Sequence, residues 1–192
     1  MADDIVDKFK QYYEDACRRQ TDINFHLPKL YELAMHCHHV TEFGVRDGES
    51  SRAFLYAATR KIGPILRSYD IDVSPIAKWL FEDAKTEGAD VRYYKGNTLE
   101  VDIEPTEMLF IDTWHTAPHL RAELERHHIK VGKYLVFHDT HSHGLGRSDT
   151  ENRGLLSAII DFMIAHPKEW EFKYYTTENN GLTVLKRIFW YK

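Results

Sequence analysis

The sequence predicts an α/β protein with a mostly parallel sheet, helices on both faces and an antiparallel last strand. Two observations predict this fold class. Short apolar or β-branched runs alternate with segments of helical periodicity along most of the chain, which is the pattern of a parallel sheet. The last two strand-like runs are joined by Asn179-Asn180-Gly181, a strong hairpin turn, and a hairpin makes the final strand antiparallel.

Two helices are expected before the first strand. Residues 3–19 carry an apolar stripe at helical spacing, with acidic residues in the first turn. A second helix opens at Leu27-Pro28, because proline is favoured in a first helical turn. The positions expected to face the core are Ile5, Phe9, Tyr13 and Ala16 in the first helix and Leu30, Leu33, Ala34 and Cys37 in the second.

Strands and helices then alternate up to the hairpin. The helix capped by Ser74-Pro75 is expected to end at Gly88, and the helix that begins at Ala117 is expected to end at Gly132. The core face expected of the helix after Ser74 is Ile76, Leu80, Phe81 and Ala84. The expected strands are 39–43, 65–71, 91–94, 108–111, 134–137, 171–175 and 182–188, and the other expected helices are 50–61, 117–131 and 154–166.

The length of 192 residues favours a single domain. Residues 1–37 are expected to form helices that cap the sheet or contact a second copy, and residues 38–192 a cofactor-binding and catalytic core. We expect a homodimer, because the two N-terminal helices offer apolar faces. Cys17 and Cys37 lie in helical patterns, which suits free thiols in a reducing compartment.

Composition excludes several classes of partner. The net charge is -5 and no run of basic residues is longer than two, so no nucleic-acid partner is expected. No apolar run approaches the ~18 residues of a membrane span, and we expect no membrane partner. The chain opens with Met-Ala-Asp-Asp-Ile, which is acidic where a secretory signal needs positive charge, so the expected location is the cytoplasm.

A glycine turn after the first strand is the most informative motif. Gly44 can adopt a positive φ, and Gly48 lets the backbone approach a ligand closely at a helix N-terminus. Glu42 would repel a pyrophosphate but suits a cationic sulfonium. The motif therefore indicates S-adenosylmethionine rather than NAD, whose G-x-G-x-x-G turn is missing.

Polar side chains follow each of the next strands as well. In an open α/β sheet, ligands bind outside the carboxyl ends of the strands. Asp70 and Asp72 could hold the hydroxyls of a ribose, although one of them is explained equally well as a helix cap. Asn97 could meet an adenine edge, and a simple turn explains it almost as well.

Two further carboxylates indicate a metal. Asp112 and Asp139 each follow a run of four apolar residues, so they should emerge at one edge of neighbouring buried strands. Buried like charges need a cation, and oxygen ligands favour Mg²⁺ or Ca²⁺, whereas nearby histidines would suit a transition metal. Helix capping by both aspartates is the alternative. The histidines nearby are His138, His141 and His143.

His115 is the candidate general base. It stands three residues after Asp112, and an imidazole beside a metal can deprotonate a hydroxyl. A histidine in the first turn of a surface helix is the alternative. Trp114 could form a wall for a substrate ring or pack against the core.

Four motifs in this order resemble class I S-adenosylmethionine-dependent methyltransferases, over roughly residues 38–190. More narrowly, they resemble the small metal-dependent O-methyltransferases of the cephalosporin-hydroxylase-like and macrolide-sugar O-methyltransferase group. The motifs are Glu42-x-Gly44-x-x-x-Gly48-x-Ser50, Tyr69-Asp70-Ile71-Asp72, Phe110-Ile111-Asp112-x-x-His115 and Phe137-His138-Asp139-Thr140. The resemblance implies a Rossmann-like sheet of seven strands, the last of them antiparallel.

The resemblance also implies a set of roles. The methionine end of the cofactor would lie against Glu42, Gly44, Gly48 and Ser50, the ribose against Asp70 or Asp72, and the adenine near Asn97. Asp112, which would also border the cofactor, and Asp139 would bind Mg²⁺. His115 would take the proton of the hydroxyl that attacks the methyl group.

One residue departs from the family pattern. The sugar-modifying relatives carry an adjacent acidic pair where this chain has His138-Asp139. A histidine ligand would weaken the preference for Mg²⁺ over Mn²⁺, Fe²⁺ or Zn²⁺. Substrate contacts are expected from the N-terminal helices and from residues 141–147, a glycine-containing loop expected to act as a mobile lid.

We therefore predict an O-methyltransferase that acts on a small molecule or glycan with vicinal hydroxyls, with S-adenosylmethionine and Mg²⁺ as cofactors. Two other functions stay open. One is a metal-dependent oxygenase or hydrolase that uses His138, Asp139, His141 and His143. The other is a methyltransferase-like fold that only binds, which the joint presence of Asp112, His115 and Asp139 disfavours.

Overall fold

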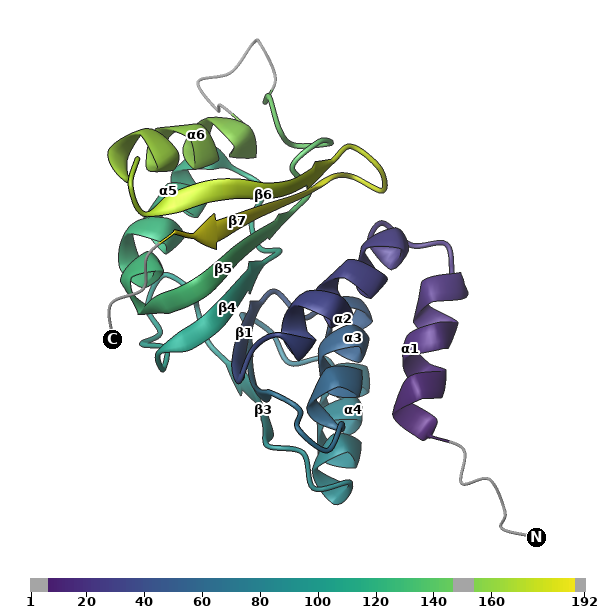
Figure 1. Cartoon of the computed structure of the whole chain (residues 1–192). Helices are drawn as coiled ribbons and strands as arrows, with labels where there is room; N and C mark the ends of the chain where they lie inside the picture. The colour runs from purple at the N-terminus through teal and green to yellow at the C-terminus, as the bar shows by residue number, and fades with distance from the viewer. Residues whose placement is uncertain (1–6, 147–153, 189–192) are drawn as a thin grey trace, which may run out of the picture.

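A seven-stranded sheet lies between two groups of helices (Figure 1) in the computed structural model, which describes residues 7–146 and 154–188. The strand order is β3-β2-β1-β4-β5-β7-β6. The strands are β1 (His39–Phe43), β2 (Ile65–Asp70), β3 (Val91–Lys95), β4 (Thr106–Ile111), β5 (Val131–His138), β6 (Trp170–Thr176) and β7 (Leu182–Arg187). The helices are α1 (Lys8–Arg18), α2 (Leu27–Met35), α3 (Glu49–Ala58), α4 (Pro75–Thr86), α5 (Ala117–His127) and α6 (Leu155–Ala165), with short 3-10 turns at Asn24–His26 and His128–Lys130.

The strand directions confirm the predicted fold class. Strands β1 to β5 run parallel, and β7 is antiparallel to both β5 and β6. The turn between β6 and β7 contains Asn179, Asn180 and Gly181, all with positive φ, as a tight hairpin requires.

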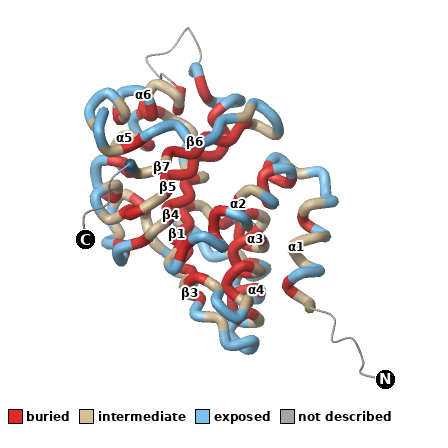
Figure 2. The backbone as a smooth tube through the Cα atoms, in the orientation of Figure 1, coloured by how far each residue is buried: buried red, intermediate tan, exposed pale blue. Residues whose placement is uncertain are grey.

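Alternate residues of the central strands face opposite layers of helices. Val40 and Phe110 belong to a core cluster under α1 to α4, whereas Phe43 and Leu109 belong to a second cluster under α5 and α6. Figure 2 shows β1, β4 and β5 as a buried band between these layers. This accounts for the near-continuous apolar run of β4, which is covered on both faces.

Helix α4 begins where its capping residues predict, but its core face is partly different. The Ser74 hydroxyl accepts hydrogen bonds from the amides of Ile76 and Ala77. Ile76, predicted to be core, is 50% exposed, and Ala77 is fully buried instead. The prediction was wrong by one residue in the first turn, because the buried stripe runs from Ala77 through Leu80 and Phe81 to Ala84.

Helix α5 ends earlier than predicted. It stops at His127, a 3-10 turn follows, and β5 already begins at Val131. Val131 pairs with Thr106 of β4, so the expected helix stop at Gly132 is a buried strand position. The helical pattern continues in the sequence, and the pairing with β4 overrides it.

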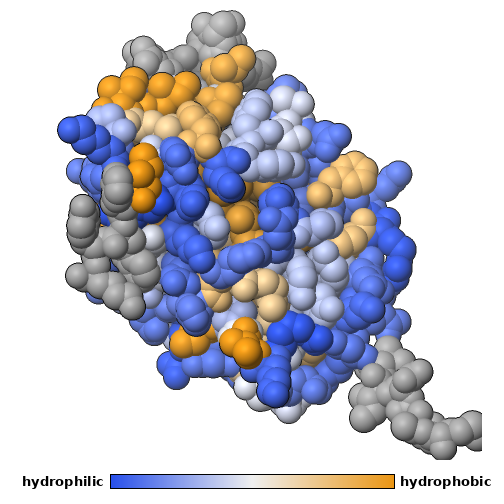
Figure 3. Space-filling view, viewed as in Figure 1, coloured by the Kyte–Doolittle hydropathy of each residue, from blue (hydrophilic) through white to orange (hydrophobic). Residues whose placement is uncertain are grey.

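The remaining core predictions hold where they can be examined. Phe9 and Ala16 of α1 and the four predicted positions around α2 are buried, Tyr13 is partly buried and packs against this core, and Ile5 lies outside the described residues. Cys17 and Cys37 are free thiols. Among the residues described, no helix has both the length and the apolar character to cross a bilayer. The face in Figure 3 is mostly hydrophilic, with apolar side chains gathered over α6, where Ile160 and Ile164 are exposed.

Candidate active site

The carboxyl ends of the parallel strands bring the predicted site residues to one edge of the sheet. Phe43, the last residue of β1, pairs with Tyr69 of β2 and with Ile111 of β4, and Ile111 pairs with Phe137 of β5. The residues that follow these strands therefore lie side by side, as the position of ligand sites in such sheets predicts.

The glycine turn after β1 is pressed against the end of β4. Gly44 has φ +83, and a Cβ there would lie 1.9 Å from the carbonyl oxygen of Asp112. Both the positive φ and the close approach of two backbones require glycine. The turn is fixed from the other side by the Asp70 carboxylate, which accepts hydrogen bonds from the amides of Val45 (2.7 Å) and Arg46 (2.8 Å).

Glu42 is fully buried beneath this turn, among hydroxyls. Its carboxylate accepts hydrogen bonds from Ser50 (2.6 Å), Ser51 (2.9 Å) and Ser68 (2.6 Å). Burial raises the pKa of Glu42 to about 7, and the serine hydroxyls oppose that rise. The side chain therefore supports the wall of the site from behind Ser50.

Two clefts meet at Gly44, Arg46 and Asp112. The first, of about 480 Å³, is bordered by the segment that follows α1, the glycine turn and the start of α3. The second, of about 490 Å³, extends toward the ends of β2 and β3. The first is lined by Thr21, Asp22, Ile23, Val45, Asp47, Glu49 and Ser50 besides the shared residues, and the second by Asp70, Ile71, Gly96, Asn97, Thr98, Leu99, Thr113, Trp114 and His119.

Some of the predicted cofactor residues line the two clefts, and others lie outside them. Gly44, Ser50, Asp70, Asn97 and Asp112 line the clefts. Glu42 and Gly48 line neither cleft, although Gly48 is the left-handed N-cap of α3. Asp72 points away, because its side chain is 87% exposed and pairs with Lys95.

The candidate catalytic residues form a compact cluster of carboxylates and imidazoles. His115 Nε2 lies 2.8 Å from Asp139 Oδ2 and 3.3 Å from Asp112 Oδ1. His138 Nδ1 lies 3.3 Å from the same Asp112 oxygen and 3.5 Å from the same Asp139 oxygen. Asp139 has φ +59, a left-handed conformation in which aspartate is several-fold enriched and which is common at functional sites.

The electrostatics of this cluster are strongly coupled. Burial lowers the pKa of both imidazoles, but the facing carboxylates of Asp112 and Asp139 outweigh it and raise the pKa of His115 to about 9 and of His138 to about 10. The same contacts hold the pKa of Asp112 and Asp139 below the usual range, against the effect of burial. Such mutual perturbation is common where chemistry is done.

The donor set suits a cation. His138 Nε2 lies 3.0 Å from the carbonyl oxygen of Asp22 and 3.3 Å from that of Asn179, so Nε2 carries the proton, since both partners only accept. The other nitrogen, Nδ1, is buried and makes no hydrogen bond to any described residue, although it faces two carboxylates. A cation that displaced the Nδ1 proton, which the raised pKa of His138 retains in the metal-free cluster, would find an imidazole nitrogen between two carboxylate oxygens, a favourable arrangement for a divalent metal.

Two of the other predicted histidines behave differently. His143 joins His115 and Asp139 in a second group of metal-capable atoms, and its ring lies 4.6 Å from that of His115. His141 belongs to no such group within the described residues. Of the loop predicted to be a lid, residues 141–146 are described and Arg147 lies outside. His141 and Ser142 both donate a backbone hydrogen bond to the Asn180 carbonyl.

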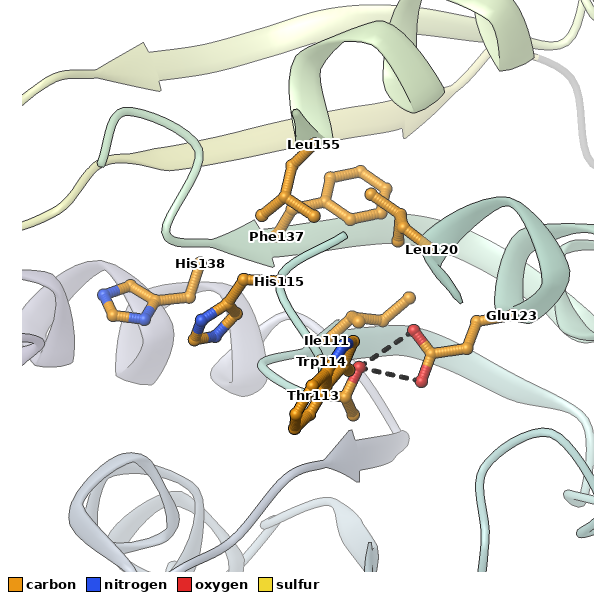
Figure 4. A pocket seen from close by; sticks show the side chains of 9 residues that line it. All are labelled: Ile111, Thr113, Trp114, His115, Leu120, Glu123, Phe137, His138 and Leu155. Atoms are coloured by element: carbon orange, nitrogen blue, oxygen red, sulfur yellow. Dashed lines mark hydrogen bonds between the residues drawn. The ribbon is translucent and has the colours of Figure 1, made fainter. Parts of the chain in front are cut away.

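Glu123 is a site residue that the sequence did not reveal. It is fully buried on α5, and its carboxylate accepts hydrogen bonds from Thr98 (2.6 Å) and Thr113 (2.9 Å), with His119 Nε2 at 3.2 Å. Figure 4 shows Thr113 and Trp114 on the side of Glu123, and His115 beside His138. Glu123 therefore fixes three residues of the second cleft, a role that only contacts between distant segments disclose.

Comparison with known proteins shows the fold. No protein-family model matches the sequence, and a search of curated proteins finds no match. Solved structures do match. An O-methyltransferase from Bacillus cereus in complex with S-adenosylhomocysteine (SAH) has 17% identity and a TM-score of 0.65, with 94% of this chain and 89% of that chain covered. An SAH-bound methyltransferase from Podospora anserina has 15% identity and a TM-score of 0.61, covering 98% and 89%.

A third matching structure is that of an enzyme that methylates nitrogen rather than oxygen. It is an N-methyltransferase from Bradyrhizobium japonicum in complex with SAH, at 11% identity and a TM-score of 0.58, with 95% of this chain and 100% of that chain covered. These likenesses confirm the predicted Rossmann-like fold of class I methyltransferases. Because both O- and N-methyltransferases share this fold, the acceptor atom has to be inferred from the chemistry of the site.

Proposed function

We propose that this protein is an S-adenosylmethionine-dependent O-methyltransferase assisted by a divalent metal. The observation that carries the proposal is the meeting of two clefts at Gly44 and Asp112, next to the cluster of Asp112, His115, His138 and Asp139. A cofactor with an amino-acid end and an adenosine end needs two such compartments, with its reactive methyl group where they join.

The lining supports an orientation of the cofactor. The amino-acid end fits the first cleft, between Ser50 and the segment that follows α1, and the adenosine fits the second, between Asp70 and Asn97. Asp70 is the candidate for the ribose because it lines the cleft and Asp72 does not. The exposed side chain of Ile71 and the half-buried side chain of Leu99 offer apolar contact to the adenine base.

Asp112, His138 and Asp139 would hold the metal, whose chemistry is to lower the pKa of a bound substrate hydroxyl. Two carboxylates suit Mg²⁺, the ion that we expect first, and the buried nitrogen of His138 extends the candidates to Mn²⁺, Fe²⁺ and Zn²⁺. SAH in the matched B. cereus and P. anserina structures supports the other cofactor.

His115 is the candidate base for an oxygen acceptor. Its Nε2 is within hydrogen-bond reach of Asp112 and Asp139, and although His115 lines neither cleft, Asp112 borders both of them. The pKa of His115 would fall toward neutrality once the charge of these carboxylates is balanced by a cation, and the imidazole could then accept the hydroxyl proton. The methyl group passes from sulfur to oxygen, and the sulfonium becomes a neutral thioether.

The acceptor is proposed to be a sugar, a glycan or a small polyhydroxylated molecule. Trp114 supports a ring-shaped acceptor, since its side chain is 71% exposed and stands next to His115 on the same loop. An exposed indole offers a flat apolar face, which packs well against one side of a ring.

The test is binding followed by turnover. Purified protein is heated with SAH, with S-adenosylmethionine and with NAD⁺ as control; ligand at about 100 times its dissociation constant should stabilise by roughly 2.7 kcal/mol. Transfer of labelled methyl groups to a panel of sugars and vicinal diols, with and without Mg²⁺, Mn²⁺ and Zn²⁺, then tests the activity. No stabilisation by either methionine-derived ligand would refute the proposal.

A second candidate is a metal-dependent oxygenase or hydrolase. The group formed by His115, Asp139 and His143 favours it, because two imidazoles and a carboxylate are a common ligand set of catalytic transition metals. Tight binding of Zn²⁺ or Fe²⁺ without any effect of S-adenosylmethionine or SAH on thermal unfolding would support this candidate. Stabilisation by SAH without methyl transfer would instead indicate a binding protein.

A further inference from the structure

The segment from Thr21 to His26, here called the strap, closes one side of the first cleft. Thr21, Asp22 and Ile23 line that cleft opposite the glycine turn. The Asp22 carboxylate lies 3.4 Å from the Arg46 guanidinium, so an ion pair joins the strap to the turn. Whatever occupies the first cleft is therefore held between the strap and the turn.

Few of the strap's attachments come from its neighbours in the chain. The Asn24 side chain bonds the Cys17 carbonyl at the end of α1. Besides the ion pair to Arg46, further anchors come from the hairpin between β6 and β7, more than 150 positions along the chain. There the Asn179 side chain accepts a hydrogen bond from the Phe25 amide (3.0 Å) and donates one to the Thr21 carbonyl (2.7 Å).

The backbone of Asn179 adds a further anchor. Its carbonyl oxygen accepts a hydrogen bond of 2.9 Å from His26 Nε2, and it also lies 3.3 Å from His138 Nε2. His138 in turn bonds the Asp22 carbonyl (3.0 Å), so the strap, the hairpin and the catalytic cluster share one network of polar contacts. Asn179 reaches the strap from a left-handed conformation with φ +47, which asparagine tolerates better than most residues.

We propose that Asn179 is a positioning residue that holds the strap against the amino-acid end of the cofactor. The inference rests on the proposed function. It follows from the two side-chain hydrogen bonds that bracket the strap, from Thr21 at one end to Phe25 near the other. A strap that is closed only part of the time would lower the apparent affinity in proportion to its closed fraction.

Asn179→Gly is the variant that tests the inference. Glycine keeps the positive φ and the backbone carbonyl, and removes only the two side-chain hydrogen bonds. Asn180→Gly is the matched control, because Asn180 also has a positive φ (+71) in the same turn, and its hydrogen bonds to other described residues as an acceptor use only its backbone oxygen. Both variants gain the same freedom in the unfolded chain.

Isothermal titration with two ligands gives the readout. SAH has the amino-acid tail, and 5′-methylthioadenosine has the adenosine and the sulfur without the tail. Asn179→Gly should weaken SAH binding at least tenfold and leave 5′-methylthioadenosine within twofold, and Asn180→Gly should leave both within twofold. Unchanged SAH affinity in Asn179→Gly, or an equal loss for both ligands, would overturn the inference.

Hydrogen exchange of the cofactor-free protein separates this inference from the proposed function. The amides of the strap should exchange at least tenfold faster in Asn179→Gly than in the wild type or in Asn180→Gly. If the wild-type protein binds neither ligand, the proposed function fails, and the exchange rates still decide whether Asn179 holds the strap. Equal exchange in all three proteins would refute that role.

Discussion

The hydroxyl of Ser68 on β2 donates a 2.6 Å hydrogen bond to the carboxylate of Glu42 on the neighbouring strand β1. Two more hydroxyls, from Ser50 and Ser51 at the start of α3, reach the same carboxylate. One buried acid thus ties two strands to the helix that follows the glycine turn. Its ionisation should affect both stability and cofactor binding.

Glu42→Gln should change how stability depends on pH. The folded-state pKa of Glu42, about 7, is raised above the usual glutamate value of 4.5. The stabilisation from its protonated form is therefore fully present below pH 4.5 and is lost as pH rises through 7. Glutamine does not titrate, so the variant should gain about 3 kcal/mol relative to the wild type between pH 4.5 and pH 8.

Thermal and urea unfolding of both proteins across this pH range measure the difference. A constant difference would mean that folding does not shift the pKa of Glu42. The wild type should also bind the cationic S-adenosylmethionine more tightly, relative to neutral SAH, as pH rises through 7. Glu42→Gln should lose that trend.

Gly44→Ala should abolish cofactor binding and destabilise the protein. The added Cβ would lie 1.9 Å from the Asp112 carbonyl oxygen, and one of the two backbones must move. Gly88→Ala is a matched control, because Gly88 has nearly the same φ (+82) and no atom within 4 Å of its Cβ position. The control should lose about 1 kcal/mol from the left-handed backbone alone, and Gly44→Ala should lose at least twice as much.

Asp139→Asn should remove metal binding while preserving the fold. Asparagine tolerates the left-handed backbone of position 139 and can still accept the hydrogen bond from Ser142 (2.9 Å). Metal affinity, measured by titration with Mn²⁺ and Zn²⁺, should fall at least 100-fold. The pKa of His115, followed by NMR, should fall below its wild-type value of about 9, because one of the two carboxylates that raise it is gone. An unchanged metal affinity would place the ion elsewhere.

His115→Gln should lower kcat by a factor of about 10² to 10⁴, the usual contribution of a general base, with little effect on SAH affinity. His141→Gln, an exposed histidine of the neighbouring loop, should retain activity and serves as the control. The wild-type rate should rise with pH as His115 loses its proton, and this rise should be absent from the variant. Equal rates in the two variants would exclude His115 as the base.

The sequence predicted the strand ends well, for a physical reason. Runs such as Met108–Ile111 are buried on both faces, and the first polar residue after them must emerge at the edge of the sheet. That logic placed Asp112 and Asp139 together correctly. The helical pattern gave a wrong core position at Ile76. The first turn of α4 has apolar residues at adjacent positions, and only packing decides that Ala77 faces the core.

Contacts between distant segments were beyond prediction. Glu123 stands in a charged stretch of α5 that is typical of a solvated face, and its burial depends on Thr98 and Thr113. Asn179 could not be predicted as a site residue either. In the sequence its place in a hairpin turn explains it fully, and only the structure shows its hydrogen bond to Thr21 of the strap. Local patterns cannot reveal a hydrogen bond that joins residues more than 150 positions apart.

The distance along the chain between Thr21 and Asn179 also bears on how the protein is made. A ribosome adds roughly 5–20 residues each second, so about 10–30 s separate the synthesis of these two residues. For most of that interval the nascent chain has its glycine turn but lacks the hairpin that secures the strap. A small-molecule ligand could therefore not assist early folding, because the hairpin residue that secures the strap is translated more than 150 positions after Thr21.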